Sequence, residues 1–536
     1  MKVRYTSVAA LASAIFLTGH VYGSKFSEFS HRKEKRAEDA MRKQEVRDSS
    51  TTNSTSSFRY LNDKTEPYRV TSLPSVPFDV GELYSGLVPV YDDPSRALFF
   101  MFGPTTGDPV DEVTIWLNGG PGCSSLEGFF QENGPFLWQA GTYQPVQNPY
   151  SWTNLTNMLW VEQPVTTGFS IGTANATSEE DIAADFVSWF KNWQDIFGIQ
   201  NYKIYVTGES YAGRYVPYIS AAMLDQNDTT YYDLSGALAY DPCIGSFNYV
   251  QQQAVAVPYA VSNNNLLNLN QSFVQEIESL HESCGYKEFV DTYLTYPPAG
   301  QQPPKFFNYS DPADIACDVF DMIDTAALTV NNCFDVYDIN SQCPLLWDVL
   351  SFPTQLVYTP DGADTYFDRT DVKQAIHAPL NVTWGLCVGA PFIDTGGNYG
   401  PESEGDTSAD PIQHVLPQVI EATNRVLISN GDYDMIIITD GTLLAIQNMT
   451  WNGQLGFQTQ PSEPINITMP DLVWTDVFAE NQIVGVDGPQ GTMGIQHYER
   501  GLMWAESFQT GHMQPEFQPR VALRHIQWVL GRIDSL

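Results

Sequence analysis

The sequence predicts an α/β protein with a mostly parallel central sheet, helices on both of its faces, and a helical and loop-rich insertion. From about residue 68 onward, short apolar segments alternate with segments of helical periodicity, which is typical of parallel strands joined by helices. Residues 244–365 differ, because they are rich in Asn, Gln and Pro and hold four of the seven cysteines. We expect this insertion to lie over the carboxyl edge of the sheet, where α/β proteins place their sites.

Five apolar segments are the clearest strand candidates, and several of them end at Gly, Asn or Glu. They are residues 113–117, 158–161, 204–206, 237–240 and 426–429. Residues 181–193 carry apolar side chains at helical spacing and predict a helix.

Composition and charge narrow the class of protein. Of the 536 residues, 43% are hydrophobic and 17% are charged, which suits a large core and excludes a mostly disordered chain. The net charge is −37, and the first fifty residues hold ten of the 26 Lys and Arg, so the rest is more acidic still. Because such a field repels phosphate and anionic lipid, we expect no nucleic-acid partner and no adhesion to anionic membranes.

The N-terminal residues predict export. Residues 1–23 combine an early positive charge, an apolar run at 8–17 and small residues before a cleavage site, as in a secretory signal peptide. Residues 24–60 are polar and locally basic, and we interpret them as a pro-segment or flexible arm. Residues 61–536 are the predicted globular domain. We expect a secreted or vacuolar protein without a membrane anchor, since no later segment is long and apolar enough to span a bilayer.

Two further features agree with an exported protein. Seven cysteines favour disulfides, and the odd number leaves at least one cysteine outside them. Nine asparagines stand in Asn-x-Ser/Thr sequons and are candidate glycosylation sites. These are Asn53, Asn154, Asn175, Asn227, Asn270, Asn308, Asn381, Asn448 and Asn466.

Ser210 is the candidate nucleophile. The strand at 204–206 leads into Gly208-Glu209-Ser210-Tyr211-Ala212, and residues 215–223 predict a helix with Pro217 in its first turn. A strand, a tight turn with small residues around a serine, and a helix form the setting of a nucleophile elbow. The last position of the motif is Ala212 instead of the usual Gly, so the pattern is met in a relaxed form.

A serine nucleophile needs a base and an acid that orients it, and in this setting the chain order is Ser, then Asp or Glu, then His. His512 lies in a loop between Gly511 and a nearby proline, which suits a fixed imidazole. Asp432 follows the strand at 426–429 and is the predicted acid, with Asp434 as its competitor.

The glycine-rich segment 118–125 follows an early strand, where this setting places one donor to the oxyanion. The segment lacks the Gly-Lys-Ser/Thr ending of a phosphate loop. Neither a His-Glu-x-x-His motif nor paired Cys-x-x-Cys motifs occur in the sequence, so we expect no metal and no cofactor.

These motifs resemble those of the serine carboxypeptidases, secreted or vacuolar peptidases with the α/β-hydrolase fold, and most of all those of the fungal members. The resemblance covers about residues 65–536. The matching stretches are 116–125, 132–135, 163–165, 168–170, 208–217, 431–434 and 511–513.

The resemblance implies a triad in which Ser210 is the nucleophile, His512 the base and Asp432 its partner. It implies an oxyanion hole made by the backbone N–H groups of Gly120 and Tyr211. The activity it implies is removal of C-terminal residues from peptides and proteins through an acyl-enzyme, without a cofactor.

By the same resemblance, the terminal carboxylate of the substrate is bound by Asn118, Glu132, Glu209 and the backbone of Gly119, and the insertion is a cap over the site. Three acidic groups would then converge when substrate binds. Because like charges raise one another's pKa, we expect activity at acidic pH.

The resemblance also implies a disulfide between Cys123 and Cys387. Four cysteines then form two bridges within the insertion, in one of three connectivities. They are Cys284, Cys317, Cys333 and Cys343. Cys243 is left outside the bridges as a buried thiol.

Three positions depart from the family pattern: Glu162 and Thr166 stand where Asp and Gly are usual, and Gln514 stands where an aliphatic residue is usual. Two other functions remain open at this point. An acyltransferase of the same family would share the triad, and a protein without catalytic activity could serve binding or protection.

Overall fold

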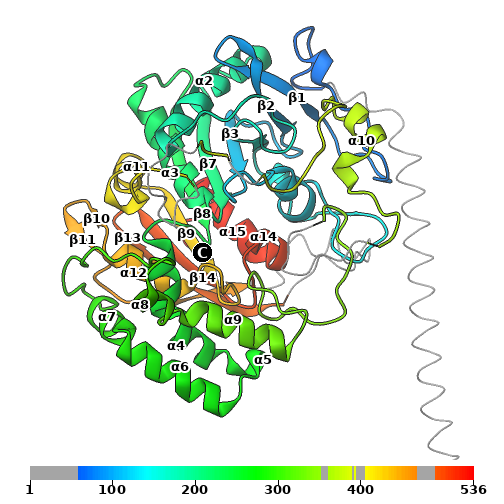
Figure 1. The fold of residues 1–536 in the computed structure, drawn as a ribbon. Helices are drawn as coiled ribbons and strands as arrows, with labels where there is room; N and C mark the ends of the chain where they lie inside the picture. Colours follow the sequence, from blue (N-terminus) through cyan, green and yellow to red (C-terminus); the bar gives the residue numbers. More distant parts are fainter. Residues whose placement is uncertain (1–57, 352–359, 389–390, 394–404, 468–488) are drawn as a thin grey trace, which may run out of the picture. The chain divides into compact units, whose positions relative to one another are not determined.

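The computed structural model describes residues 58–351, 360–388, 391–393, 405–467 and 489–536. The predicted signal peptide, nearly all of the predicted pro-segment and Asn53 lie outside these residues. A ten-stranded sheet forms the centre, in the strand order β1-β2-β6-β3-β7-β8-β9-β14-β13-β12 (Figure 1). Neighbouring strands from β6 to β14 run parallel, whereas the strands at both edges are antiparallel.

The strands of this sheet are β1 (Tyr84–Val90), β2 (Asp93–Gly103), β3 (Glu112–Leu117), β6 (Asn157–Glu162), β7 (Lys203–Glu209), β8 (Asp233–Tyr240), β9 (Val426–Gly431), β12 (Glu463–Ile467), β13 (Gly491–Glu499) and β14 (Leu502–Ser507). Two small antiparallel pairs are β4 (Phe136–Leu137) with β5 (Val146–Gln147), and β10 (Thr450–Trp451) with β11 (Gln454–Leu455).

The α-helices are α2 (Glu179–Phe197), α3 (Ala212–Asp225), α4 (Ala254–Ser262), α5 (Asn264–Leu267), α6 (Gln271–Ser283), α7 (Tyr286–Tyr293), α8 (Pro312–Ile315), α9 (Val319–Val330), α10 (Thr370–Ala375), α11 (Val415–Thr423), α12 (Thr439–Gln447), α14 (Gln514–Phe517) and α15 (Pro519–Val529). Shorter 3₁₀ or π segments are η1 (Glu66–Tyr68), η2 (Gly128–Glu132), η3 (Trp152–Asn154), η4 (Phe247–Gln253), η5 (Tyr366–Asp368) and η6 (Pro411–Gln413).

Both faces of the sheet are buried, because alternate side chains of each central strand enter two different cores. In β3, Val113, Ile115 and Leu117 pack on the face covered by α2, α3 and α11. Trp116 packs on the opposite face with side chains of α15 such as Ile526. This double burial explains why the middle of each central strand is mostly apolar.

The five predicted strands and the helix at 181–193 are confirmed, as β3, β6, β7, β8, β9 and α2. The predicted start of the helix after Ser210 is wrong. That helix, α3, begins at Ala212, so Pro217 lies inside it and not in its first turn. The reason is that the turn at Ser210 leads directly into the helix, with the carbonyl oxygen of Ser210 accepting a hydrogen bond from Gly213 N.

The insertion contains helices α4 to α9, of which α4, α6, α7 and α9 share a core of their own (Figure 1). Its cysteines pair as Cys284–Cys317 and Cys333–Cys343. The third disulfide, Cys123–Cys387, is the pairing that the resemblance implied, and Cys243 is buried outside the three bridges. Among the described residues, no helix has the length and apolar character needed to cross a membrane.

Candidate active site

Ser210 stands at the sharp turn between β7 and α3. Its φ of +62° is rare for a residue with a side chain and reflects a backbone held in a strained conformation. A Cβ atom on Gly208 would clash with the carbonyl oxygen of Leu117, and one on Gly119 would clash with the backbone nitrogen of Tyr211. The small residues around Ser210 therefore allow the turn to lie against the loop after β3.

His512 is buried in the loop that follows β14, and its ring forms a hydrogen bond with Asp434. The distance from His512 Nδ1 to Asp434 Oδ2 is 2.8 Å, and both side chains are at most 3% exposed. Asp434 Oδ1 accepts a hydrogen bond from Ile436 N at 2.8 Å. This bond fixes the carboxylate against the imidazole.

The prediction that Asp432 is the partner of His512 is wrong, because Asp434 holds that place. Its Oδ1 atom accepts a hydrogen bond from the backbone of Thr510 at 3.3 Å, and burial raises its pKa to about 7. The backbone turns back at this point, with Asp434 N donating to Gly431 O. The second aspartate of the turn, not the first, therefore faces His512.

The other ring nitrogen of His512, Nε2, is buried and has no hydrogen-bond partner among the described residues. The backbone N–H of His512 donates to the carbonyl oxygen of Tyr337 at 2.7 Å, and the two rings lie 5.1 Å apart. The insertion thus helps to hold the histidine. Burial lowers the pKa of His512, while the nearby carboxyl groups of Asp241 and Asp335 oppose that effect.

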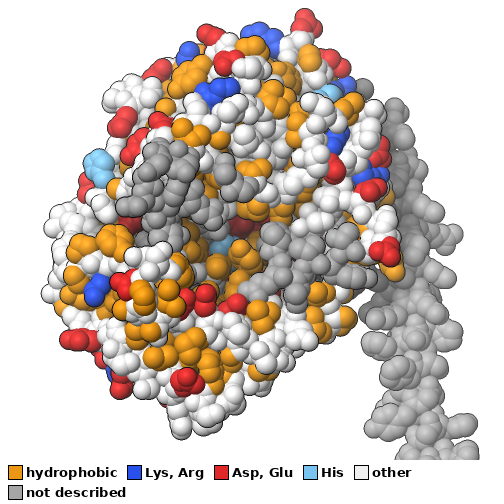
Figure 2. Space-filling view, in the orientation of Figure 1, with side chains coloured by type: hydrophobic (Ala, Val, Ile, Leu, Met, Phe, Trp, Pro, Cys, Tyr) orange, Lys and Arg blue, Asp and Glu red, His pale blue; other side chains and the backbone are white. Residues whose placement is uncertain are grey.

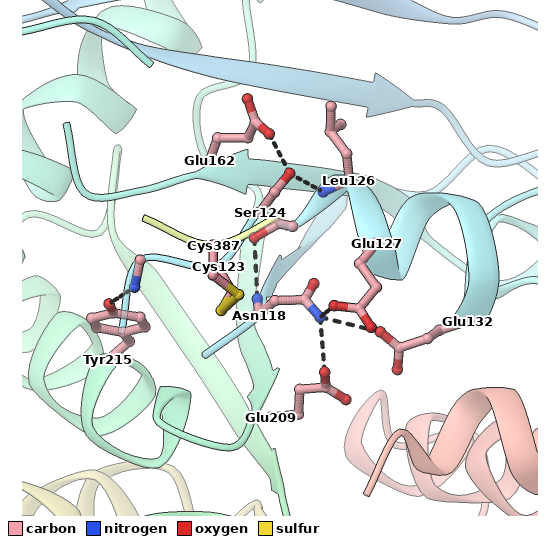
Figure 3. Close-up of a disulfide and its surroundings, with 12 residues drawn as sticks. Asn118, Cys123, Ser124, Leu126, Glu127, Glu132, Glu162, Glu209, Tyr215 and Cys387 are labelled. Carbon is pink, nitrogen blue, oxygen red and sulfur yellow. Dashed lines mark hydrogen bonds between the residues drawn. A yellow bond between two sulfur atoms is a disulfide. The ribbon is translucent and has the colours of Figure 1, made fainter. Parts of the chain in front are cut away.

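A cluster of three glutamates surrounds Asn118, which follows β3 (Figure 3). The amide nitrogen of Asn118 lies 2.8 Å from Glu209 Oε1, 3.3 Å from Glu132 Oε1 and 3.3 Å from Glu127 Oε2. Its amide oxygen accepts a hydrogen bond from Trp116 Nε1 at 2.8 Å, which fixes the orientation of the amide. Strand pairing explains the contact, because Leu117 is opposite Gly208 and the next residues therefore meet.

Burial raises the pKa of all three glutamates well above the ordinary value, and their neighbouring carboxyls raise it further. Glu132 and Glu209 each keep one oxygen, Oε2, that is buried without a hydrogen-bond partner among the described residues. The cluster can therefore hold protons and offer them to a ligand. The family resemblance implied Asn118, Glu132 and Glu209 but not Glu127, which stands five residues before Glu132 and is also buried.

A cavity of ≈ 340 Å³ is lined by residues that neighbour those of the site in the sequence. Its lining includes Gln131, which precedes Glu132, and Met513, which follows His512. Tyr337 and Glu516 line it as well. On the face that Figure 2 shows, acidic side chains are more widespread than basic ones.

Glu162, one of the departures from the family pattern, is a structural residue. Its Oε1 atom accepts hydrogen bonds from Ser124 and Trp384, and its Oε2 atom accepts one from Phe169 N. Burial raises its pKa to about 7. Glu162 thereby ties the glycine-rich segment to the chain after β6. Figure 3 shows its contact with Ser124.

Comparison with known proteins decides the family. A family model described as serine carboxypeptidase matches residues 74–532. The chain belongs to the serine carboxypeptidase family. Within this family, it is 67% identical over 483 residues to the serine-type carboxypeptidase F of Aspergillus niger, covering 89% of each chain. It is 43% identical to a probable serine carboxypeptidase of Arthroderma benhamiae, covering 89% of this chain and 88% of that one.

A solved carboxypeptidase has the same fold. It is a prohormone-processing carboxypeptidase of Saccharomyces cerevisiae, with a TM-score of 0.65 and 22% sequence identity, covering 87% of this chain and 96% of that chain. The sheet order and this likeness give the chain the predicted α/β-hydrolase fold. As a member of the serine carboxypeptidase family, the protein is a peptide hydrolase of the serine type.

Proposed function

We propose that Ser210, His512 and Asp434 form the triad of an enzyme that removes C-terminal residues from peptides. Ser210 Oγ attacks the carbonyl carbon of the last peptide bond while His512 Nε2 takes its proton. The C–N bond breaks, the leaving amino acid takes that proton from His512, and an ester to Ser210 remains. Water, deprotonated by His512, then attacks the ester carbonyl, and His512 returns the proton to Ser210 Oγ as the shortened peptide leaves. Asp434 orients the imidazole and stabilises its charged form.

The N–H groups of Gly120 and Tyr211 are the proposed donors to the oxyanion. Tyr211 is the N-cap residue of α3, and the amides at a helix N-terminus attract negative charge. The close approach of Gly119 to Tyr211 N supports the assignment, because it brings the glycine-rich loop next to that amide.

The observation that carries the choice of an exopeptidase is the group of carboxyls around Asn118, directly beside Ser210. Buried carboxyl groups with raised pKa stay protonated in acid and can donate hydrogen bonds to a carboxylate. We assign Glu132, Glu209, Asn118 and the backbone of Gly119 to the terminal carboxylate of the substrate. The side chain of the leaving residue would then occupy the adjoining cavity.

The proposed route of the protein is export to the cell exterior or the vacuole, with residues 1–23 as signal peptide and 24–60 as pro-segment. Residues 61–536 are the proposed catalytic domain. Eight of the nine sequon asparagines are described, and all except Asn448 are exposed, which supports glycosylation at several of them. Asn448 is half-buried, and its Oδ1 atom accepts a hydrogen bond from Gln302 N.

Four measurements test the proposed function. A fluorophosphonate should label the wild type but not Ser210→Ala, and that variant should lose several orders of magnitude in turnover by analogy with other triads. A blocked peptide with a free C-terminus should be cleaved far faster than its C-terminal amide. Near-wild-type turnover by Ser210→Ala would disprove the mechanism. Acyl transfer from an acyl-glucose to an alcohol, without peptide hydrolysis, would assign the acyltransferase function instead.

A further inference from the structure

A second buried aspartate lies beside the triad. Asp241 is the first residue after β8, and Asp434 comes after the neighbouring strand β9. One oxygen of each aspartate and one ring nitrogen of His512 all lie within 4.8 Å of one another. Asp241 has a φ of +40°, and its backbone nitrogen donates to Ser429 O at 2.7 Å. Its side chain is therefore held in place by a strained backbone.

The charges around this pair are mostly of one sign. Asp241 and Asp434 are both 0% exposed and His512 is 2% exposed. The other titratable groups that face them are acids or phenols. They are Asp335 and Tyr337 from the insertion, Tyr259 from α4, Glu209 from the end of β7, and Tyr240 from β8. Two ionised carboxylates in contact would be very costly here, so one of the two aspartates keeps its proton.

The hydrogen bonds indicate which aspartate is ionised. Asp434 accepts from two backbone N–H groups, those of Ile436 and Ile437, and from His512, whose ring becomes positive during the reaction. Asp241 accepts only neutral donors among the described residues. Asp434 is thus the better site for the negative charge.

Gln514 fixes the second oxygen of Asp241. The hydroxyls of Ser429 and Ser507 donate to Gln514 Oε1 at 2.8 and 3.0 Å, so the amide nitrogen must point the other way. That nitrogen donates to Asp241 Oδ2 at 2.6 Å, and Gly431 N donates to Oδ1 at 2.8 Å. Two donors lock the carboxyl group of Asp241 while its proton remains available to Asp434.

We propose that Asp241 is a positioning residue: a neutral carboxylic acid that donates a hydrogen bond to Asp434 and keeps Asp434 ionised and aligned with His512. The proposal rests on the proposed triad. Burial raises the pKa of both aspartates, and the hydrogen bond between them opposes that effect for Asp434. Asp241 thereby lets Asp434 stay ionised in acid, where the glutamates that bind the substrate carboxylate must be protonated.

The test compares three variants at Asp241 and Asp434, with kcat and KM measured from about pH 4 to 8. Asp241→Asn keeps a hydrogen-bond donor to Asp434, and asparagine tolerates the positive φ at this position. The variant loses only the hydrogen bond from Gln514, so we expect its kcat to stay within about tenfold of the wild-type value. Asp241→Ala has no donor and should lower kcat by about 10- to 100-fold with little change in KM. Its acidic limb should move to higher pH, because Asp434 loses a hydrogen bond to its charged form. Asp434→Asn should be far worse than either.

Asp432→Asn is the matched control, because Asp432 lies in the same turn without contacting His512, and it should behave as the wild type. Thermal unfolding of each variant separates misfolding from lost alignment, and recovery of kcat from Asp241→Ala to Asp241→Asn supports the donor role directly. An equal loss of kcat in Asp241→Asn and Asp434→Asn would overturn the proposal. So would an acidic limb of the kcat profile that lies at the same pH in Asp241→Ala as in the wild type. An active Ser210→Ala would instead refute the triad itself.

Discussion

Asp434 is one of two aspartates in the turn after β9, and only its carboxylate reaches the imidazole of His512. We expect Asp434→Asn to lower kcat by about 10⁴-fold, because the amide cannot stabilise the imidazolium and favours the wrong tautomer. Asp432→Asn should change kcat by less than about threefold, because its partner is the backbone of Thr510. Steady-state kinetics on a blocked dipeptide at acidic pH checks both values, and the reverse ranking would restore Asp432 as the acid.

Glu132 leads to a prediction on pH and substrate binding. Burial raises the pKa of the carboxyl groups around Asn118, and these groups lose their protons as the pH rises. The KM of a free-acid peptide should therefore increase by about tenfold per pH unit for each proton that binding requires. Glu132→Gln keeps a donor that does not titrate and should make this increase shallower. An amidated peptide brings no carboxylate and should show little pH dependence.

The measurement is KM against pH from about 4 to 8, for both peptides and both proteins. A flat KM for the free-acid peptide in the wild type would contradict the carboxylate assignment. Glu127→Gln extends the test to the glutamate that the sequence did not reveal. A steep KM profile that survives in both glutamine variants would leave Glu209 as the titrating group.

At this scale, the sequence predicts residues that carry a local signature and misses those defined by tertiary contacts. Ser210 is recognisable because a strand, small residues and a helix surround it. The choice between Asp432 and Asp434 depends on how the turn after β9 folds back, which no local pattern encodes. Asp241 has a usable signal, since it directly follows an apolar strand, whereas Glu127 has none beyond its distance from Glu132.

The glycine-rich loop after β3 is the element whose position depends most on a distant segment. The disulfide Cys123–Cys387 joins residues 264 apart, and Ser124 N donates to Leu386 O at 2.7 Å beside it. We expect the double variant Cys123→Ser with Cys387→Ser to lose about 2–5 kcal/mol in the free energy of unfolding. Its kcat should also fall, because the loop carries the proposed oxyanion donor.

The matched control is the double serine variant of Cys284 and Cys317, whose bridge lies within the insertion. It should lose stability but keep kcat. Denaturant unfolding and kinetics on the same preparations give both quantities. Equal loss of kcat in the two double variants would mean that the disulfide beside the site acts on stability alone.

Among the elements, burial decides which ones the sequence predicts. The parallel strands β3, β6, β7, β8 and β9 are buried on both faces, so each has a mostly apolar middle segment that the sequence reveals. Strand β13, which lies next to the edge strand β12, mixes buried and partly exposed residues and includes Gly, Gln and His, which leaves a weak signal. The start of α3 was also missed, because the strained turn at Ser210 feeds the helix without an intervening loop.

The whole molecule is strongly acidic, and many of its carboxyl groups are buried. The net charge is −37, and acidic side chains are more widespread than basic ones on the face shown in Figure 2. Burial raises the pKa of Glu162 to about 7 and of Glu516 to about 8, in addition to the cluster around Asn118. Both the surface field and the buried acids therefore favour an acidic environment for the folded protein.

The last prediction is that stability falls as pH rises. Glu132 has an ordinary pKa of 4.5, and burial raises it well above that value in the folded protein. At pH values below this ordinary pKa, Glu132 holds its proton in both the folded and the unfolded chain, and its ionisation costs no stability. As pH rises toward the folded pKa, the unfolded chain releases the proton first, so each such group costs about 1.4 kcal/mol per pH unit in the free energy of unfolding.

Denaturant unfolding at several pH values between about 4.5 and 7.5 measures the slope of the free energy of unfolding against pH. Glu132→Gln should make this slope shallower by about 1.4 kcal/mol per pH unit, the equivalent of one proton. Repulsion between surface carboxylates gives a slope of the same sign, but salt screens it. Repeating the series at high ionic strength should therefore leave the difference between wild type and Glu132→Gln intact. No difference in slope between wild type and Glu132→Gln, or a difference that disappears in salt, would show that Glu132 is ionised in the folded protein and cannot donate a hydrogen bond to the substrate.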